Sequence, residues 1–176
     1  MNTEWSLDCL YTGYNDPAFE EDMKHLKELA DEIKNPPAKL SEQGAGEVVP
    51  YLLTLLETYY ETLSRLDIYV SLRSSVNTAE KETKAWEERI MQIHSAISRE
   101  LAGIDRYFAE VKDMEFIQLR APFVKDYEFY FAEKRKKAAH MLSEESEEIL
   151  FRMNLSGGAA WGKLQKYLTS TVTADY

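Results

Sequence analysis

The sequence predicts an all-α protein, an elongated antiparallel domain of five or six helices with a short β-like segment at its C-terminus. Apolar residues recur at helical spacing along most of the chain, whereas only 7 glycines and 5 prolines are available for tight turns. Hydrophobic residues make up 44% of the 176 residues, which is enough for a packed core and excludes intrinsic disorder. This length corresponds to a single domain, residues 1–176.

The first half of the chain predicts an ordered arm followed by two helices. Residues 1–15 contain several large apolar side chains, each of which gains about 1.5–3 kcal/mol when it is buried. A first helix is expected to begin at Asp16, which can cap free amides, with Pro17 in its first turn, and to end at Asn35. A second helix is expected from about residue 50 to residue 75, with a wide apolar stripe.

The second half of the chain predicts longer helices and, at the C-terminus, the start of a strand. The expected elements are one continuous helix over 77–111, a short helix or turn over 113–120, a helix from Pro122, a helix capped by Ser143, a break at 156–158 and a last helix. A helix of about 33 residues would be roughly 50 Å long, so the body should be elongated. Residues 169–176 are rich in β-branched side chains, and 171–176 are expected to start a truncated strand.

The charge balance argues against nucleic acid and membrane partners. The chain has 31 acidic and 21 basic residues, a formal charge of −10, whereas phosphate binding needs clustered lysine and arginine. The one basic run, 134–137, is expected to be a solvated helix face. No apolar run of 18 residues and no secretory leader are found, so the expected compartment is the cytoplasm.

The titratable residues form no catalytic or metal-binding motif. His25, His94 and His140 do not belong to a His-Glu-x-x-His motif, in which two histidines one turn apart bind zinc. A ferritin-like metal bundle is also disfavoured, because its Glu-x-x-His pairs are missing. The single cysteine, Cys9, is expected to be a small buried thiol. We therefore assign no catalytic residue, no metal ligand and no cofactor to this chain.

Aromatic side chains give the only candidate contact site. Aromatic residues between 127 and 131 point in almost every direction around a helix, which is typical of a helix buried on more than one side. Core packing explains this pattern, and contact with another domain or a peptide channel explains it as well. The candidate peptide-channel or inter-lobe contact residues are Tyr59, Tyr60, Tyr127, Tyr130 and Phe131.

Several motifs resemble the N-terminal lobe of oligoendopeptidase F, of the thimet-oligopeptidase-like zinc metallopeptidases. The matching runs are WSLDCLY at 5–11, DPAF at 16–19, HMLSEESE at 140–147, GAAWGKL at 158–164 and LTS at 168–170. The family shows histidine, leucine, serine and an acidic run, followed by an Ala-Trp pair and then Leu-Thr-Ser. The resemblance extends over essentially the whole chain in the same order.

The resemblance implies a helical, cytoplasmic lobe that walls a channel in which a zinc enzyme hydrolyses short peptides. In that family the zinc motif lies in a separate catalytic lobe, so no catalytic or zinc-binding residue can be transferred to this chain. The implied partners are the catalytic lobe and an oligopeptide substrate, and the chain alone is expected to be inactive. It is either part of a longer peptidase or a relative that kept this lobe without the chemistry.

The alternative function is a stand-alone helical protein-interaction module. Such a module would hold its partner in a groove lined by tyrosines, but it gives no reason for the runs at 140–147 and 158–164. Self-association of the chain is also expected, if residues 122–131 normally contact the catalytic lobe and leave an apolar patch exposed without it. The strand expected at 171–176 could pair with another copy in the same way.

Overall fold

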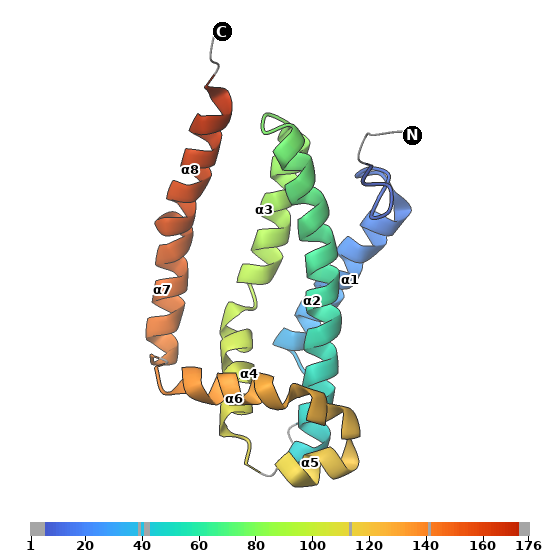
Figure 1. Ribbon diagram of the computed structural model, residues 1–176, viewed down its shortest axis with the longest axis vertical. Helices are drawn as coiled ribbons and strands as arrows, with labels where there is room; N and C mark the ends of the chain where they lie inside the picture. Colours follow the sequence, from blue (N-terminus) through green and yellow to red (C-terminus); the bar gives the residue numbers. More distant parts are fainter. Residues whose placement is uncertain (1–5, 39, 41–42, 113, 141, 173–176) are drawn as a thin grey trace.

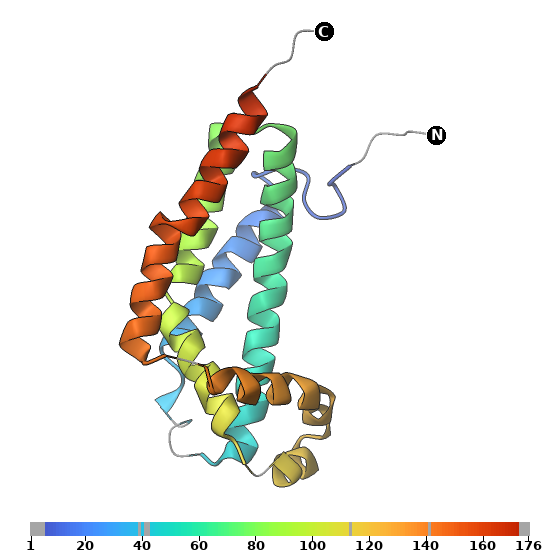
Figure 2. The same cartoon turned by 60° about the vertical axis from the view of Figure 1, so that its left-hand side comes forward.

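The computed structural model describes residues 6–38, 40, 43–112, 114–140 and 142–172. Within these residues it is all-α, as the sequence predicts, and the elements are α1 (Pro17–Lys34), α2 (Ala45–Val76), α3 (Lys81–Ser95), α4 (Ser98–Glu110), α5 (Met114–Arg120), η2 (Pro122–Tyr127), α6 (Glu128–Ala138), α7 (Glu144–Ser156) and α8 (Gly158–Thr171). The body is elongated, with α6 crossing one end and α7 and α8 following each other in one long rod (Figure 1). Figure 2 shows the same rod running alongside α3 and α4.

The first part of the core joins the N-terminal arm to α1, α2 and α3. Phe19 on α1 is completely buried and touches the rings of Tyr11, Tyr14, Tyr69 and Trp86 at centroid distances between 5.0 and 5.9 Å. Edge-to-face contacts dominate this cluster, as the charge distribution of aromatic rings favours. The prediction of an ordered arm is therefore confirmed for its described tyrosines, Tyr11 and Tyr14, whose rings contact Tyr69 of α2.

The arm also makes a polar contact that fixes α1 on α2. The Tyr11 hydroxyl donates to Asp22 at 2.5 Å, and Arg65 of α2 lies 3.0 Å from the same carboxylate. Burial, with the hydrogen bond to Asp22, raises the pKa of Tyr11, so its hydroxyl stays protonated and donates. Cys9, in contrast, is exposed, and the expected buried thiol is wrong because the turn at residues 8–10 places this side chain outside the core.

The second part of the core lies where α4 meets α6, near the lower end of α2. Phe108 and Phe131 are completely buried, and their rings contact each other at 5.3 Å. An ion pair joins Lys134 of α6 to Asp105 of α4 at 2.5 Å, and the Tyr127 hydroxyl donates to Glu57 of α2 at 2.5 Å. Helix α2 therefore takes part in both parts of the core.

The long helix expected over 77–111 is wrong, because the chain breaks into α3 and α4 at residues 96 and 97. Ile97 leaves the helical region with φ −115° and ψ 9°, and its amide bonds to the His94 carbonyl three residues back. The Ser95 hydroxyl donates to the Gln92 carbonyl at 3.0 Å, a local bond that competes with the helix ladder. The break lets α3 pack on α2 while α4 packs on α6 and α7.

Two helix starts also differ from those expected. Helix α2 begins at Ala45, five residues before Pro50, so Pro50 lies inside the helix near its N-terminus and not at its start. The helix expected from Pro122 begins with the 3-10 turn η2 and becomes α-helical at Glu128. The caps at Asp16 and Ser143 are confirmed, since their side chains accept from the amides of Ala18 and Ser146.

The C-terminal rod differs most from the sequence prediction. Helix α8 continues to Thr171, so residues 169–171 are helical and not part of a strand. The rest of the expected strand, 173–176, lies outside the described residues. Along α8 the exposed side chains include Trp161 at 71% and Leu168 at 53%. Of the strand expected at 171–176, Thr171 is therefore helical, and Val172 is an extended residue that ends α8 without pairing in a sheet among the described residues.

Candidate functional site

A groove runs between α8 and the pair formed by α2 and α3, with a volume of about 740 Å³. Three helices contribute to it, and its lining residues are Leu63, Ser64, Asp67, Ser71, Ser74, Thr78, Lys84, Glu87, Glu88, Ile90, Met91, His94, Lys163, Leu164, Lys166 and Tyr167. We call this feature the α8 groove. Its volume falls within the range of pockets that bind small molecules and short peptides.

Small side chains on α2 make the groove concave. Ser64, Asp67, Ser71 and Ser74 follow one another at spacings of three and four residues, which places them on one face of the helix. Serine side chains at these positions leave space that leucine would fill. The apolar part of the lining includes Leu63 of α2 and Ile90 and Met91 of α3.

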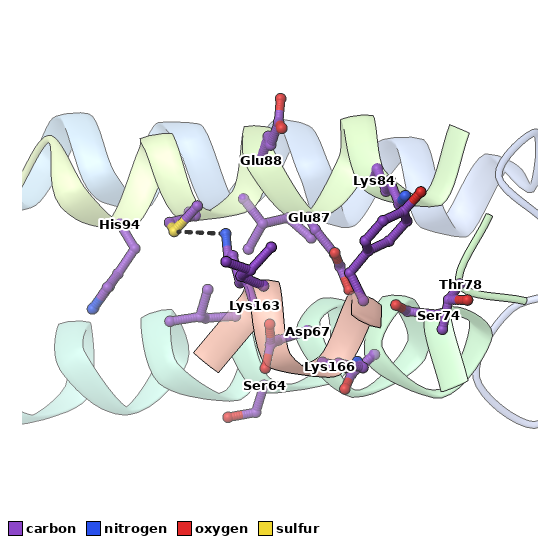
Figure 3. Close-up of a pocket in the computed structure, with 16 residues that line it drawn as sticks. Ser64, Asp67, Ser74, Thr78, Lys84, Glu87, Glu88, His94, Lys163 and Lys166 are labelled. Atoms are coloured by element: carbon purple, nitrogen blue, oxygen red, sulfur yellow. Dashed lines mark hydrogen bonds between the residues drawn. The ribbon is translucent and has the colours of Figure 1, made fainter. Parts of the chain in front are cut away.

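The two walls of the groove carry charges of opposite sign, apart from Lys84 of α3, whose ammonium lies 5.0 Å from the centre of the Tyr167 ring of α8. Helix α8 contributes Lys163 and Lys166, whereas α2 contributes Asp67 and α3 contributes Glu87 (Figure 3). Among the described residues, none of these four groups belongs to an ion pair. In Figure 3 the Glu88 carboxylate extends away from α2, so we do not count it among the charges of the wall.

His94 lies at one end of the groove and is held by Tyr59. The Tyr59 hydroxyl lies 2.9 Å from His94 Nδ1, and the two rings are stacked at 6.1 Å. Burial raises the pKa of Tyr59, which keeps this hydroxyl protonated. Burial also lowers the pKa of His94, and the nearby Asp67 carboxylate opposes this effect without reversing it. His94 is therefore a neutral polar group in the groove at neutral pH.

This burial predicts a pH dependence of stability. Because the pKa of His94 is lower in the folded chain than the ordinary 6.5, the unfolded chain binds a proton first as the pH falls. The contribution of His94 to the free energy of unfolding is fully present above pH 6.5. It is lost as the pH falls from 6.5 toward the lower pKa that His94 has in the folded chain. We expect H94Q to reduce the difference in unfolding free energy between pH 7 and pH 5, measured by urea denaturation.

The matched control for that measurement is H140Q, since His140 lies in an exposed turn after α6. We expect this substitution to leave the difference between the two pH values as it is in the unmodified chain. An H94Q variant with an unchanged pH dependence would contradict the assignment of His94 as a buried neutral group.

The aromatic residues singled out in the sequence lie in different environments. Tyr59 and Phe131 are completely buried, so neither can touch a partner in this structure. Tyr60 is 43% exposed, while Tyr127 and Tyr130 are half-buried and their rings are 6.4 Å apart. The accessible members of the set are thus Tyr60, Tyr127 and Tyr130.

Charges around Tyr60 and Tyr130 link this aromatic group to the second part of the core. Burial, with a smaller effect of Asp105, raises the pKa of Tyr130 to about 12. The Lys134 ammonium lies 4.9 Å from the centre of the Tyr130 ring, a cation–π contact. Tyr60 contacts the His94 ring at 6.4 Å, so the exposed tyrosine lies next to one end of the α8 groove.

The residues of the groove were not predicted from the sequence. The polar stripe of Ser64, Asp67, Ser71 and Ser74 was a usable signal, because four small or acidic residues share one face of a largely apolar helix. Lys163 and Lys166 gave no such signal, since their role depends on where α8 lies relative to α2 and α3.

No group of three or more histidine, cysteine, aspartate or glutamate side chains that could hold a metal ion is found among the described residues. In the same part of the chain, no helix is both long enough and apolar enough to span a membrane.

In the comparison with known proteins, residues 108–173 match the model of a peptidase family. That family is described as oligopeptidase F, and the matched model is its N-terminal domain. The matched part runs from the last turn of α4 through α8, less than half of the chain. The match supports an N-terminal lobe of an oligopeptidase F-like peptidase, as the sequence motifs predicted. Neither the curated proteins nor the solved structures contain a match.

Proposed function

We propose that this chain is the N-terminal, channel-walling lobe of an oligoendopeptidase-F-like zinc metallopeptidase that hydrolyses short peptides. The match over residues 108–173 supports the family, and the all-α architecture fits such a lobe. The zinc ion and the residues that bind it belong to the catalytic lobe, so the chain alone has no hydrolytic activity. The partners are that catalytic lobe and an oligopeptide, and the compartment implied by the family is the cytoplasm.

The α8 groove is the observation that carries this proposal. The apolar part of its lining can accept the side chains of a peptide, while the Asp67 carboxylate and the Lys163 ammonium can bind opposite charges on the same molecule. Tyr60 lies beside one end of the groove and extends the contact surface. A wall of this kind would line a channel, and we assign Tyr60, Tyr127 and Tyr130 to contacts with peptide or with the catalytic lobe.

The absence of activity is tested directly with the purified chain. We expect no hydrolysis of an internally quenched fluorogenic oligopeptide, with or without added zinc, because the chain supplies no metal-binding cluster in its described part. Fluorescence and mass spectrometry of the peptide after incubation would measure this. Cleavage by the pure chain that is abolished by a chelator would contradict the proposal.

Peptide binding is tested in the same preparation by NMR of methionine methyl groups. We expect a short leucine- and alanine-containing peptide to shift the signal of Met91, which lines the groove. Met23 is buried in the first part of the core and Met153 is exposed on α7, so their signals should stay in place. Equal shifts at all three methionines, or none at millimolar peptide, would count against a peptide-binding lobe.

A second candidate function is the stand-alone interaction module, which the exposed apolar side chains of α7 and α8 favour. Large apolar groups exposed by at least 45% on these helices include Ile149, Leu150, Met153, Trp161, Leu164, Tyr167 and Leu168. Monomers rarely expose a large contiguous apolar surface, so a macromolecular partner or a second copy could cover it. Light scattering across concentration would detect self-association, and a coding sequence with His-Glu-x-x-His downstream would favour the peptidase lobe.

A further inference from the structure

We propose that α8 is a hinged lid that closes onto α2 and α3 and holds a short peptide in the α8 groove. The closing movement is inferred from this structure alone, whereas the choice of a peptide as ligand rests on the proposed function. The inference follows from three features of α8: how weakly it is held, what faces it across the groove, and what joins it to α7.

Helix α8 is attached to the body at only a few points. None of its residues is buried, although it is 14 residues long. The Lys163 ammonium lies 3.7 Å from the Met91 sulfur, and the Lys84 ammonium lies 5.0 Å from the centre of the Tyr167 ring. Helices of this length gain most of their stability from packing, so α8 has much to gain by moving onto a partner surface.

The surface across the groove is complementary to α8 in charge and in polarity. Helix α8 presents Lys163 and Lys166, and the opposite wall presents Asp67 and Glu87 together with one lysine, Lys84. These charges have no ion-pair partners among the described residues, so closure would let them pair. The apolar groups also match, because Leu164 and Tyr167 of α8 line the same groove as Ile90 and Met91 of α3.

The junction between α7 and α8 provides the hinge. Gly157 ends α7 with φ −101° and ψ −102°, outside the helical region, and Gly158 begins α8. A side chain at Gly157 would place its Cβ 2.8 Å from the Met153 carbonyl oxygen, so the backbone passes too closely for any other residue. Two consecutive glycines let α8 change direction while α7 stays packed on α4.

The chemistry of the walls favours a short peptide over a simple anion or cation. A peptide with free termini carries both charges and apolar side chains, and the groove offers partners for each. His94 adds a neutral polar group that can bond to a peptide amide, and its ring is fixed from behind by Tyr59. A peptide between the walls would form ion pairs with the charges of both walls, which bridges them and draws the lid inward.

Electron spin resonance of the whole chain tests the movement. Spin labels are placed at Val76, which is 87% exposed at the end of α2, and at Thr169 on α8, in a chain whose exposed Cys9 is replaced by serine. We expect a synthetic leucine- and alanine-containing heptapeptide with free termini to shift this distance distribution to shorter values. The distance between spin labels at Val76 and at Lys27 of α1 should not change, since both positions lie outside the rod formed by α7 and α8.

Charge reversal and a hinge variant complete the test. We expect D67K/E87K to weaken peptide binding about tenfold and to lengthen the labelled distance, and K163E/K166E in the same chain to restore the shorter distance. Reversal of Lys27 and Lys34 on α1 is the matched control and should change neither. G158A, whose Cβ would meet only the Asn154 side chain, should narrow the distance distribution.

The outcomes separate the two parts of the proposal. A distance that responds to charge reversal but not to peptide supports the lid and overturns the peptide ligand, and with it the main support for the proposed function. A distance that stays fixed in every variant, with Met91 still shifted by peptide, overturns the lid and leaves the proposed function standing.

Discussion

Replacement of Phe19 by alanine should lower the free energy of unfolding by about 3–5 kcal/mol, the usual cost of removing a buried phenylalanine. The ring is completely buried, and the Trp86 ring meets it at 5.0 Å in a nearly perpendicular arrangement. Its removal leaves a cavity between the aromatic residues of the arm, of α2 and of α3, and we expect these residues not to fill it. Urea denaturation followed by circular dichroism measures the loss.

Phe129 offers the matched control for this substitution. Its side chain is 77% exposed on α6, so F129A should change the unfolding free energy by no more than about 0.5 kcal/mol. A loss below about 1 kcal/mol for F19A would mean that the arm does not pack on α1 as described, because the cavity term alone would exceed it.

Replacement of Phe131 by alanine is expected to cost a similar amount, about 3–5 kcal/mol, in the isolated chain. The ring is completely buried and contacts Phe108 at 5.3 Å and Tyr130 at 5.8 Å. This prediction separates the two explanations for the aromatic residues of α6. A residue that only touched a partner would leave the stability of the chain unchanged when it is truncated.

Two further variants show which explanation holds. L119A on α5, where the side chain is 83% exposed, should be nearly neutral and serves as the control for handling and measurement. Y60A removes an accessible tyrosine and should cost less stability than F131A. If F131A unfolds at the same urea concentration as L119A, Phe131 is not part of the core.

Local chemistry made several elements predictable, and long-range packing decided the others. Asp16 and Ser143 could be recognised as caps because their side chains bond to amides two or three residues away. The break between α3 and α4 could not be recognised from periodicity. Ile97 is 1% exposed and keeps the apolar spacing of both helices, so the pattern continues where the helix itself stops.

In the candidate site, too, local patterns were predictable from the sequence and long-range packing was not. The aromatic composition of residues 59–60 and 127–131 indicated a special environment, but adjacent residues on a helix point about 100° apart. Tyr59 is consequently buried while Tyr60 is 43% exposed, and composition alone does not separate them. The α8 groove depends on the position of α8 beside helices that precede it by about 70 or more residues in the chain, which no local pattern encodes.

Helix α2 is one uninterrupted rod of 32 residues that takes part in both parts of the core. Tyr69 packs in the first part, and Glu57 bonds to Tyr127 beside the second. One inserted residue between them would rotate one end against the other by about 100° and shift it by about 1.5 Å. Relatives of this protein should therefore vary in length at residues 35–44, between α1 and α2, and keep the spacing from Glu57 to Tyr69 constant.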